Sequence, residues 1–526
     1  MPFHVRIRNI GWIIACLLVA VPLVAANVLP SFPDPDSFYH AKMALILRDQ
    51  GLLYAFPWFQ FTELKDTFAN PHLLYHAALI PFVSAFDPLV GMRVSAVVFG
   101  LVALASLFLV LRALKVPLPL LFVSAAALSI GFMHRMALPR APALSIALLL
   151  FLTWAMRAKR PLLCFLLSST FVWFYHGWPV ALLSLGALLA GDLLARRVDA
   201  PEGFWRCGLD TLREWCVTAG SVLAGLAAGL VVNPYFPHNI AFSVVDIFKI
   251  GVVNYQGTLP VGQEWLPASV ADYVSQNAPT ALFWLACFCL FLPGIRLRGA
   301  LVKRTEIADV FAFFLLAGGY TLLTLKSARY VEYAIPFVIL SAGTFFRFGE
   351  PFVRQELVPF VESWIRRSSW RRPLLLFCAS ILVIVLAAEE WRSLLRTRPY
   401  FRVEQYQIAA DWMRENIPVG ETVFHNSWDF SLILWYLDDE HRYLAGLDPT
   451  FMYDEDPEAF EVWRSLVNGD EKNVSRIVST FHARTVVVDT RLDGSAKLIK
   501  NLDQSDVFRE VAHNTWIRIY AHTTLL

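Results

Sequence analysis

Two carboxylates flank a proline in FPDPDSFYHAKMA, residues 32–44, and these are the first residues whose types and spacing could do chemistry. Asp34 and Asp36 follow a long apolar run, which places them at a predicted membrane boundary. Paired carboxylates can hold a divalent cation or act as a general base, provided that the site offsets the cost of their desolvation. Because Pro35 favours an extended turn, we expect both side chains to point to the same side. A plain solvated turn is the alternative interpretation.

A further carboxylate and three arginines lie in other connections that are predicted on the same side of the membrane as Asp34 and Asp36. Glu264 lies in VGQEW, within the long connection 234–278. Arg135 and Arg140 lie in the short turn HRMALPRA, and Arg329 lies in KSAR at the start of an apolar run. Positive charge on this side opposes the usual bias of membrane proteins, so these arginines either snorkel to lipid phosphate or bind the phosphate of a substrate.

Candidate binding residues lie in two further places. Trp428 and Asp429 follow a predicted strand in HNSWDFSLILWYL, where Asp429 could also simply cap the next helix. His176 stands between aromatic residues in FYHGWP, which favours a place in the lining of a pocket. No pair among the histidines predicted on this side has the spacing of a zinc site.

The composition indicates a membrane protein that crosses the bilayer many times. Of the 526 residues, 57% are hydrophobic and only 17% are charged, against about 25% charged residues in soluble proteins. The basic residues are scattered over short connections, which argues against nucleic acid as a partner.

Eleven apolar runs set the predicted topology. They cover about 10–29, 92–112, 117–133, 142–156, 161–174, 178–195, 214–233, 279–295, 307–325, 330–346 and 373–390. The excess of Lys and Arg in alternate connections places the N-terminus in the cytoplasm. This alternation holds only if a twelfth apolar stretch, 73–86, lies along the outer surface. The resulting domain is 1–390, with outer loops 30–91 and 234–278.

The remainder, 391–526, is predicted to be an external soluble α/β domain. VEQYQIAADWMRENI has helical periodicity and stops before Pro418 and Gly420. TVFH, RTVVVD and WIRIYAH have the pattern of strands. The predicted fold class is therefore mainly α, a polytopic membrane protein with a C-terminal α/β domain.

Taken together, these residues resemble the GT-C superfamily of multi-span glycosyltransferases, and within it the catalytic subunit of oligosaccharyltransferase. An acidic motif with two aromatics and a histidine, directly after the first span, is similar to the first outer loop of that family. The resemblance implies that Asp36 binds the metal and the acceptor, and that Glu264 matches the glutamate of a late outer loop. Arg329 matches an arginine that opens a late span.

The Trp428-Asp429 pair resembles the family's external motif that reads the acceptor. Two features depart from the family pattern. The second acidic motif is missing, because HRMALPRA carries no carboxylate, and the double tryptophan is reduced to one. The first departure puts the expected cation, Mg²⁺ or Mn²⁺ held by Asp36 and Glu264, in question. The second puts recognition of an asparagine sequon in question.

The resemblance implies a membrane glycosyltransferase of a bacterial or archaeal cytoplasmic membrane, with its active face outside. It would move a sugar or oligosaccharide from a polyprenyl-phosphate or polyprenyl-diphosphate donor to a protein, lipid or glycan acceptor. Arg329, Arg135 and Arg140 would bind the donor phosphate, and Asp36, Asp34 and Glu264 would be catalytic. A transporter or flippase is the alternative, and it predicts ionisable residues near the membrane midplane and repeated halves. A non-catalytic scaffold is the third interpretation.

Overall fold

The computed structural model describes residues 19–199, 204–253, 255, 257–298, 302–366, 368, 370–371, 388 and 401–525. The chain divides into two compact units. The helical unit comprises Met1–Leu29, Arg93–Val232 and Glu264–Thr397. The sheet unit comprises Pro30–Met92, Asn233–Gln263 and Arg398–Leu526. The predicted outer connection 234–278 is thus divided between the units at Gln263 and Glu264, and the predicted boundary at residue 390 lies outside the described residues.

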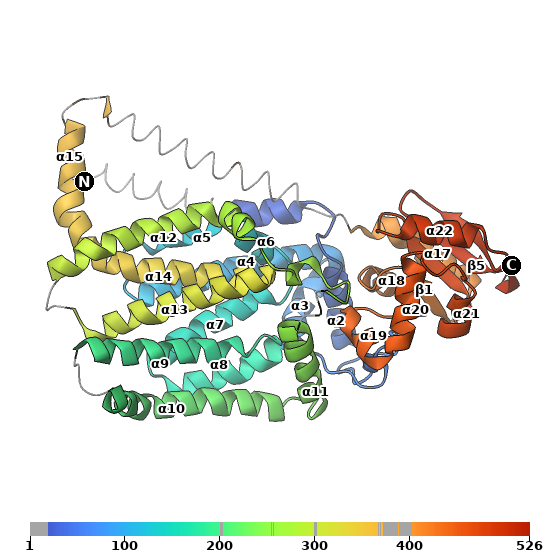
Figure 1. Cartoon of the computed structure of the whole chain (residues 1–526), viewed down its shortest axis with the longest axis horizontal. Helices are drawn as coiled ribbons and strands as arrows, with labels where there is room; N and C mark the ends of the chain where they lie inside the picture. The colour runs from blue at the N-terminus through green and yellow to red at the C-terminus, as the bar shows by residue number, and fades with distance from the viewer. Residues whose placement is uncertain are drawn as a thin grey trace. The chain divides into compact units, whose positions relative to one another are not determined.

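Helices of 7 to 29 residues build the helical unit. They are α4 (Pro88–Ala113), α5 (Pro119–Ala127), α6 (Ile130–Met136), α7 (Pro142–Arg157), α8 (Pro161–Phe174), α9 (Val180–Asp199), α10 (Phe204–Val231), α12 (Val270–Arg298), α13 (Arg304–Lys326), α14 (Val331–Phe352) and α15 (Val358–Arg366). Helices α12, α13 and α14 run side by side, and α9 packs on α13 (Figure 1). Small residues permit this approach: a Cβ on Gly191 of α9 would meet the backbone oxygen of Ala308 at 2.6 Å.

Five of the described helices are long and apolar enough to cross a membrane, and a bent pair of helices could supply a sixth span. One prediction from the apolar runs changes here, and another is not tested. The predicted span 117–133 is broken, because α5 and α6 meet at 89° around Ser129, whose hydroxyl caps α6 by accepting the N–H of Phe132. The predicted span 373–390 lies outside the described residues except for residue 388, so the predicted count of eleven stays a prediction.

One end of the helical unit holds a network of ion pairs. Arg157, at the end of α7, binds both carboxylate oxygens of Asp309, near the start of α13. Arg347 of α14 approaches the same carboxylate at 3.5 Å, and Arg298 at the end of α12 pairs with Glu306 at 2.8 Å. Arg157 and Arg298 belong to connections predicted to be cytoplasmic, and together with Arg347 they join α7, α12, α13 and α14.

The sheet unit is built on five strands in the order β2-β1-β3-β5-β4. The strands are β1 (Thr422–His425), β2 (Arg442–Tyr443), β3 (Thr485–Asp489), β4 (Phe508–His513) and β5 (Ile517–His522). β1 pairs in parallel with β2 and β3, whereas β5 is antiparallel to β3 and β4. The predicted strands TVFH, RTVVVD and WIRIYAH are β1, β3 and β5. The two edge strands, β2 and β4, were not predicted.

Nine helices of the described residues complete the sheet unit. They are α2 (Asp36–Asp49), α3 (Leu73–Ala85), α11 (His238–Val244), α17 (Val403–Asn416), α18 (Ser431–Leu437), α19 (Pro449–Glu455), α20 (Pro457–Val467), α21 (Arg476–Phe481) and α22 (Ser495–Asp503). Helix α17 ends at Asn416, where the sequence predicted it to stop. Helix α3 has 13 residues and is about 20 Å long, shorter than the roughly 30 Å of a bilayer core.

Segments far apart in the sequence meet in the sheet unit. The backbone of residues 58–61 pairs with the edge strand β2: Tyr443 donates its N–H to the carbonyl of Trp58 at 2.7 Å. Helix α2 packs on α18, where the ring of Phe38 lies 5.7 Å from that of Tyr436. Lys42 of α2 pairs with Asp439 at 2.9 Å. Helix α2 is therefore fixed against the element that follows Trp428 and Asp429.

Trp435 of α18 lies at the centre of this contact. It is fully buried, and its ring centroid lies 4.8 Å from that of Phe56 and 6.0 Å from that of Tyr39. We predict that Trp435→Ala lowers the free energy of unfolding by about 3–5 kcal/mol, because it leaves a cavity among these rings. Thermal unfolding of the detergent-solubilised chain measures this loss. Val419→Ala, at a position 73% exposed, is the control and should change little.

Candidate functional site

Three arginines surround one carboxylate in the helical unit. Glu264, in the 3₁₀ turn Gln263–Trp265, binds Arg135 at the end of α6 and Arg140 just before α7, the latter at 2.9 Å. Arg329, in the turn before α14, approaches Glu264 at 3.7 Å. The structure therefore brings together four residues that the sequence singled out separately, from three different connections. We call Arg135, Arg140, Arg329 and Glu264, with Glu332, the arginine cluster.

Arg329 is held by aromatic groups as well as by charge. It is 8% exposed, its guanidinium stacks 4.1 Å above the ring centroid of Trp265, and it donates to the hydroxyl of Tyr175 at 2.9 Å. Cation–π stacking and a neutral hydrogen-bond acceptor fix the guanidinium without neutralising it. Trp265 and Tyr175 were not singled out from the sequence. In the sequence, only their positions next to Glu264 and His176 could have indicated that Trp265 and Tyr175 belong to the site.

Glu332 completes the arginine cluster with a partner that the sequence did not indicate. Its position three residues after Arg329 suggested a pair between these two residues. Instead, the fully buried Glu332 accepts a hydrogen bond from Arg135 at 2.8 Å. Arg329 lies in the 3₁₀ turn Ala328–Tyr330, before the regular helix begins, and its side chain stacks on Trp265.

The charges of the arginine cluster do not balance. Three guanidinium groups face two carboxylates, so these five side chains carry a net charge of +1. Burial disfavours the ionised form of Glu264, but the charges of Arg135, Arg140 and Arg329 outweigh it and hold the pKa of that carboxyl well below its ordinary value. Glu264 therefore stays ionised and keeps the three arginines together. A buried excess of positive charge favours an anion, and planar guanidinium groups suit phosphate.

In the sheet unit, the Asp34–Asp36 segment begins a helix. The extended turn expected from the sequence is wrong, because Pro35 has the αR backbone conformation and Asp36 is the first residue of α2. Asp34 Oδ1 accepts the backbone N–H of Ser37 at 3.1 Å and its hydroxyl at 3.2 Å. Asp34 thus acts as a helix cap. Asp36 occupies the first turn, where the helix dipole favours a negative charge.

Trp428 and Asp429 lie after β1, at the carboxyl end of a central strand. Asp429 accepts the N–H of Phe430 at 2.7 Å and the hydroxyl of Ser427, but it does not cap α18, whose N-cap is Phe430 without a side-chain cap. Burial raises the pKa of Asp429. Trp428 donates its indole N–H to the carbonyl of Pro260 at 2.9 Å, which ties this loop to the segment before Glu264.

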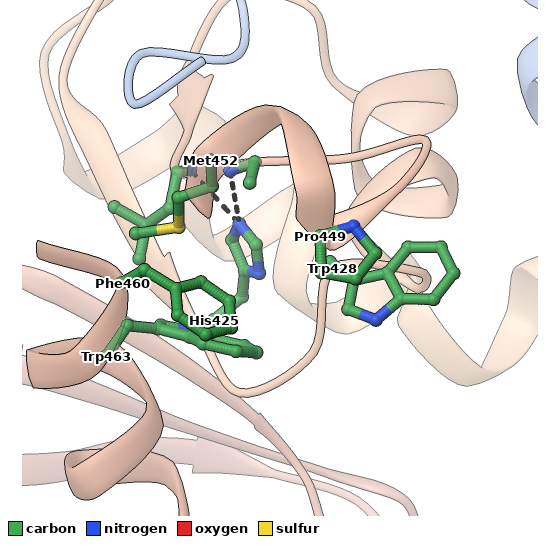
Figure 2. A pocket seen from close by; sticks show the side chains of 8 residues that line it. His425, Trp428, Pro449, Met452, Phe460 and Trp463 are labelled. Atoms are coloured by element: carbon green, nitrogen blue, oxygen red, sulfur yellow. Dashed lines mark hydrogen bonds between the residues drawn. The ribbon is translucent and has the colours of Figure 1, made fainter. Parts of the chain in front are cut away.

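Trp428 also borders an apolar pocket. The pocket is lined by His425, Trp428, Leu444, Ala445, Pro449, Met452, Phe460 and Trp463. Figure 2 shows the ring of Trp428 on one side and those of Phe460 and Trp463 on the other. His425 is 1% exposed and accepts the N–H of Leu444 at 3.0 Å, and burial lowers its pKa to about 4. The histidine is therefore a neutral structural group.

The predicted site residues fall into two groups. The arginine cluster lies in the helical unit, and His176 belongs beside it, since its ring lies 4.3 Å from that of Tyr175. Asp34, Asp36, Trp428 and Asp429 lie in the sheet unit on elements that pack together. Among the residues that the structure describes, there is no group of three His, Cys, Asp or Glu side chains placed to hold a metal ion.

Solved structures share this arrangement of helices. The archaeal oligosaccharyltransferase AglB from Archaeoglobus fulgidus, in complex with an inhibitory peptide and a dolichol-phosphate, superimposes with a TM-score of 0.58 at 12% identity. The match covers 98% of this chain and 74% of that chain. ArnT from Cupriavidus metallidurans, bound to undecaprenyl phosphate, gives a TM-score of 0.56 at 13% identity, covering 98% of this chain and 99% of that chain. Both are GT-C glycosyltransferases.

This chain has the GT-C fold. No protein-family model and no curated protein matches its sequence, so the likeness concerns the fold alone. The apolar helices and the GT-C fold together identify a multi-pass membrane protein. Within this GT-C fold, the arginine cluster is formed by the connections before α7, α12 and α14.

Removing the central carboxylate of the arginine cluster tests its role. We predict that Glu264→Gln lowers the free energy of unfolding at pH 7 by about 3–5 kcal/mol, because it leaves two buried guanidinium groups and a partly buried one with a single carboxylate. A carboxyl whose pKa is depressed in the folded state stabilises the chain above its ordinary pKa of 4.5. This stabilisation is lost as the pH falls through the folded-state pKa, so the difference between the two chains should shrink in acid.

Thermal unfolding at a series of pH values measures both effects. Glu510→Gln is the control, since Glu510 pairs with Arg518 at 3.1 Å on the partly exposed edge of the sheet and a surface pair contributes little. Equal melting temperatures for Glu264→Gln and the natural chain at pH 7 would show that the arginines do not depend on this carboxylate.

Proposed function

We propose that the chain is a glycosyltransferase that moves a sugar or oligosaccharide from a polyprenyl-phosphate or polyprenyl-diphosphate donor to an acceptor at the outer face of the cytoplasmic membrane. The observation that carries the proposal is the buried excess of positive charge in the arginine cluster. Its arginines come from three connections at one end of the helical unit and offer guanidinium groups to a phosphate. The GT-C fold supports this choice, because AglB and ArnT were solved with dolichol-phosphate and undecaprenyl phosphate, respectively.

In this proposal, Arg329, Arg135 and Arg140 bind the donor phosphate. As the bond between the sugar and the phosphate oxygen breaks, its electron pair goes to the phosphate, and the guanidinium groups stabilise the growing negative charge. The acceptor nucleophile forms the new bond to the sugar and gives up its proton to Asp36. Glu264 contributes by holding the arginines in place. Asp34 contributes by accepting hydrogen bonds at the start of α2, the helix that carries Asp36.

The cation predicted from the family resemblance, Mg²⁺ or Mn²⁺, does not fit at Glu264. One carboxylate oxygen is shared by Arg135 and Arg140, and the other faces Arg329 at 3.7 Å, so a cation would meet three like charges. Asp36 remains the candidate ligand on the other unit, together with Asp34, whose Oδ2 is buried without a hydrogen bond in the part of the chain described. No step of the proposed transfer depends on a cation.

The acceptor is proposed to bind in the sheet unit near Trp428 and Asp429. The apolar pocket beside Trp428 would take a hydrophobic group of the acceptor, whether this is a protein, a lipid or a glycan carrier. His176, next to Tyr175 in the helical unit, is also proposed to bind the acceptor. The single tryptophan argues against recognition of an asparagine sequon.

Loss of Asp36 should leave the donor unused. We predict that cells whose protein carries Asp36→Asn accumulate one polyprenyl-linked sugar, because the carboxylate that accepts the proton is gone. Mass spectrometry of lipid extracts, at matched protein levels in the membrane, measures the accumulation and identifies the sugar. Asp66→Asn changes an exposed aspartate of the same unit and serves as the control. Identical amounts of lipid-linked sugar in cells with the natural chain, Asp36→Asn and Asp66→Asn would favour a transporter or flippase.

Loss of Arg329 should weaken donor binding. We predict that Arg329→Gln raises the half-saturating donor concentration at least 10-fold, since a charge-assisted contact contributes about 1.5–3 kcal/mol. Arg329→Lys should recover only part of the affinity, because lysine cannot offer two parallel hydrogen bonds or the same stacking on Trp265. Donor titrations of the purified chain in lipid vesicles measure both values. Arg518→Gln, on β5 beside the edge strand β4, is the matched control.

A further inference from the structure

Helix α15 of the helical unit carries an uncovered stripe of apolar side chains. The stripe starts at the last residue of the π-helical segment η6 (Val353–Leu357) and follows the spacing of one helix face: Leu357, Phe360, Val361, Trp364 and Ile365. Glu362, Ser363 and Arg366 lie on the opposite face. Within α15, which the structure describes in full, no residue is buried, and Phe360 is 67% exposed. The proposed function assigns no role to this helix.

The length of the preceding helix places α15 at a membrane boundary. Helix α14 has 22 residues and is about 33 Å long, which matches the roughly 30 Å of a bilayer core. The whole helical stretch Ala328–Arg366 has 39 residues, and a straight helix of that length, about 58 Å, would extend far beyond the core. Figure 1 shows instead that α15 turns across the direction of α14. The turn lies at η6, between Pro351 and Pro359, neither of which can donate a backbone hydrogen bond.

Basic and aromatic residues accompany the apolar stripe. The segment 353–372 contains five arginines and two glutamates, which gives it a net charge of +3. The side chain of Arg366 is 80% exposed. Arg371 stacks on two indoles, with its guanidinium carbon 4.7 Å from the ring centroid of Trp364 and 5.8 Å from that of Trp370. Tryptophan beside arginine is typical of the boundary between the hydrocarbon core and the lipid headgroups.

We propose that α15 is a lipid-binding helix that lies in the surface of one leaflet, at the end of α14 opposite Arg329. Phe360 and Trp364 insert between the acyl chains, as the apolar face of an interfacial helix does. Arg366 and Arg371 bind the headgroups, and their charge selects anionic phospholipids.

A lipid fits the stripe better than a second protein does. The stripe starts where a helix of membrane-spanning length ends, so lipid is already adjacent to it. The positive charge of the segment complements an anionic leaflet, and the positive-inside pattern predicts that this leaflet faces the cytoplasm. The inference goes beyond the proposed function and does not depend on it, because lipid binding by α15 requires no sugar transfer.

Photocrosslinking of the full chain tests which molecule covers the apolar stripe. One variant carries benzoylphenylalanine in place of Phe360, and its control carries it in place of Glu362, on the opposite face of the same helix. The side chain of Glu362 is 58% exposed and Phe360 is 67% exposed, so the two positions are similarly accessible. Each variant is irradiated in vesicles of phosphatidylcholine and phosphatidylglycerol, mixed at three to one, and mass spectrometry of its peptides identifies the adducts.

We expect about 10-fold more lipid adducts at position 360 than at position 362, because only the apolar face enters the acyl chains. The ratio of phosphatidylglycerol to phosphatidylcholine among the adducts should exceed that of the vesicle about 5-fold, the effect of one basic residue at an anionic surface. Arg366→Gln combined with Arg371→Gln should remove this enrichment and leave the adducts at position 360. Arg414→Gln, at a partly exposed residue of α17, is the control for the loss of charge and should leave the enrichment unchanged.

Other outcomes would overturn the proposal. Equal amounts of lipid adduct at positions 360 and 362, or none at either, would show that the apolar stripe does not lie in the leaflet. Adducts between two copies of the chain at position 360 would make the stripe an interface between copies. Lipid adducts with the same lipid ratio as the vesicle would contradict the role of Arg366 and Arg371. The assay contains no sugar donor, so failure of the proposed function would leave its result unchanged.

Discussion

The sharing of one carboxylate by three guanidinium groups constrains the rest of the helical unit. Glu264 can stay ionised in a buried setting only because Arg135, Arg140 and Arg329 surround it, and the arginines can stay close only because Glu264 and Glu332 separate their charges. The starts of α7, α12 and α14 must therefore meet at one place, and the end of α8 must bring Tyr175 there. The remaining positive charge is the feature that we propose to bind the anionic donor.

A second constraint acts in the sheet unit. Asp36 belongs to a helix whose far side packs on α18 through Phe38 and Tyr436, and whose Lys42 pairs with Asp439. Helix α18 begins directly after the loop that holds Trp428. The carboxylate proposed to take the acceptor proton and the tryptophan proposed to bind the acceptor are thus mounted on two helices in direct contact. Such support suits a reaction that depends on orientation more than on reactive side chains.

The sequence predicted the helices and strands better than it predicted which side chains contact one another. Arg135, Arg140, Arg329 and Glu264 could be singled out because charge on that side of a membrane is unusual. Glu332 could not be assigned to Arg135, because spacing along one helix says nothing about a neighbouring helix. The Asp34–Asp36 segment was expected to be extended from Pro35, but capping by Asp34 starts a helix there. The two-residue strand β2 forms through its neighbours, and no periodicity in so short a run could reveal it.

The pairing of residues 58–61 with β2 has a consequence for how the protein is made. The indole of Trp58 donates to the carbonyl of Asp439, a contact between residues 381 positions apart. Synthesis at about 5–20 residues per second separates the two by roughly 20–80 s. During that time, the aromatic side chains of Phe56, Trp58 and Phe59 have no partner from α18 or β2. The contacts of Phe56 with Tyr39 and Phe68 can form early, whereas those with α18 and β2 must wait until the last quarter of the chain has been synthesised.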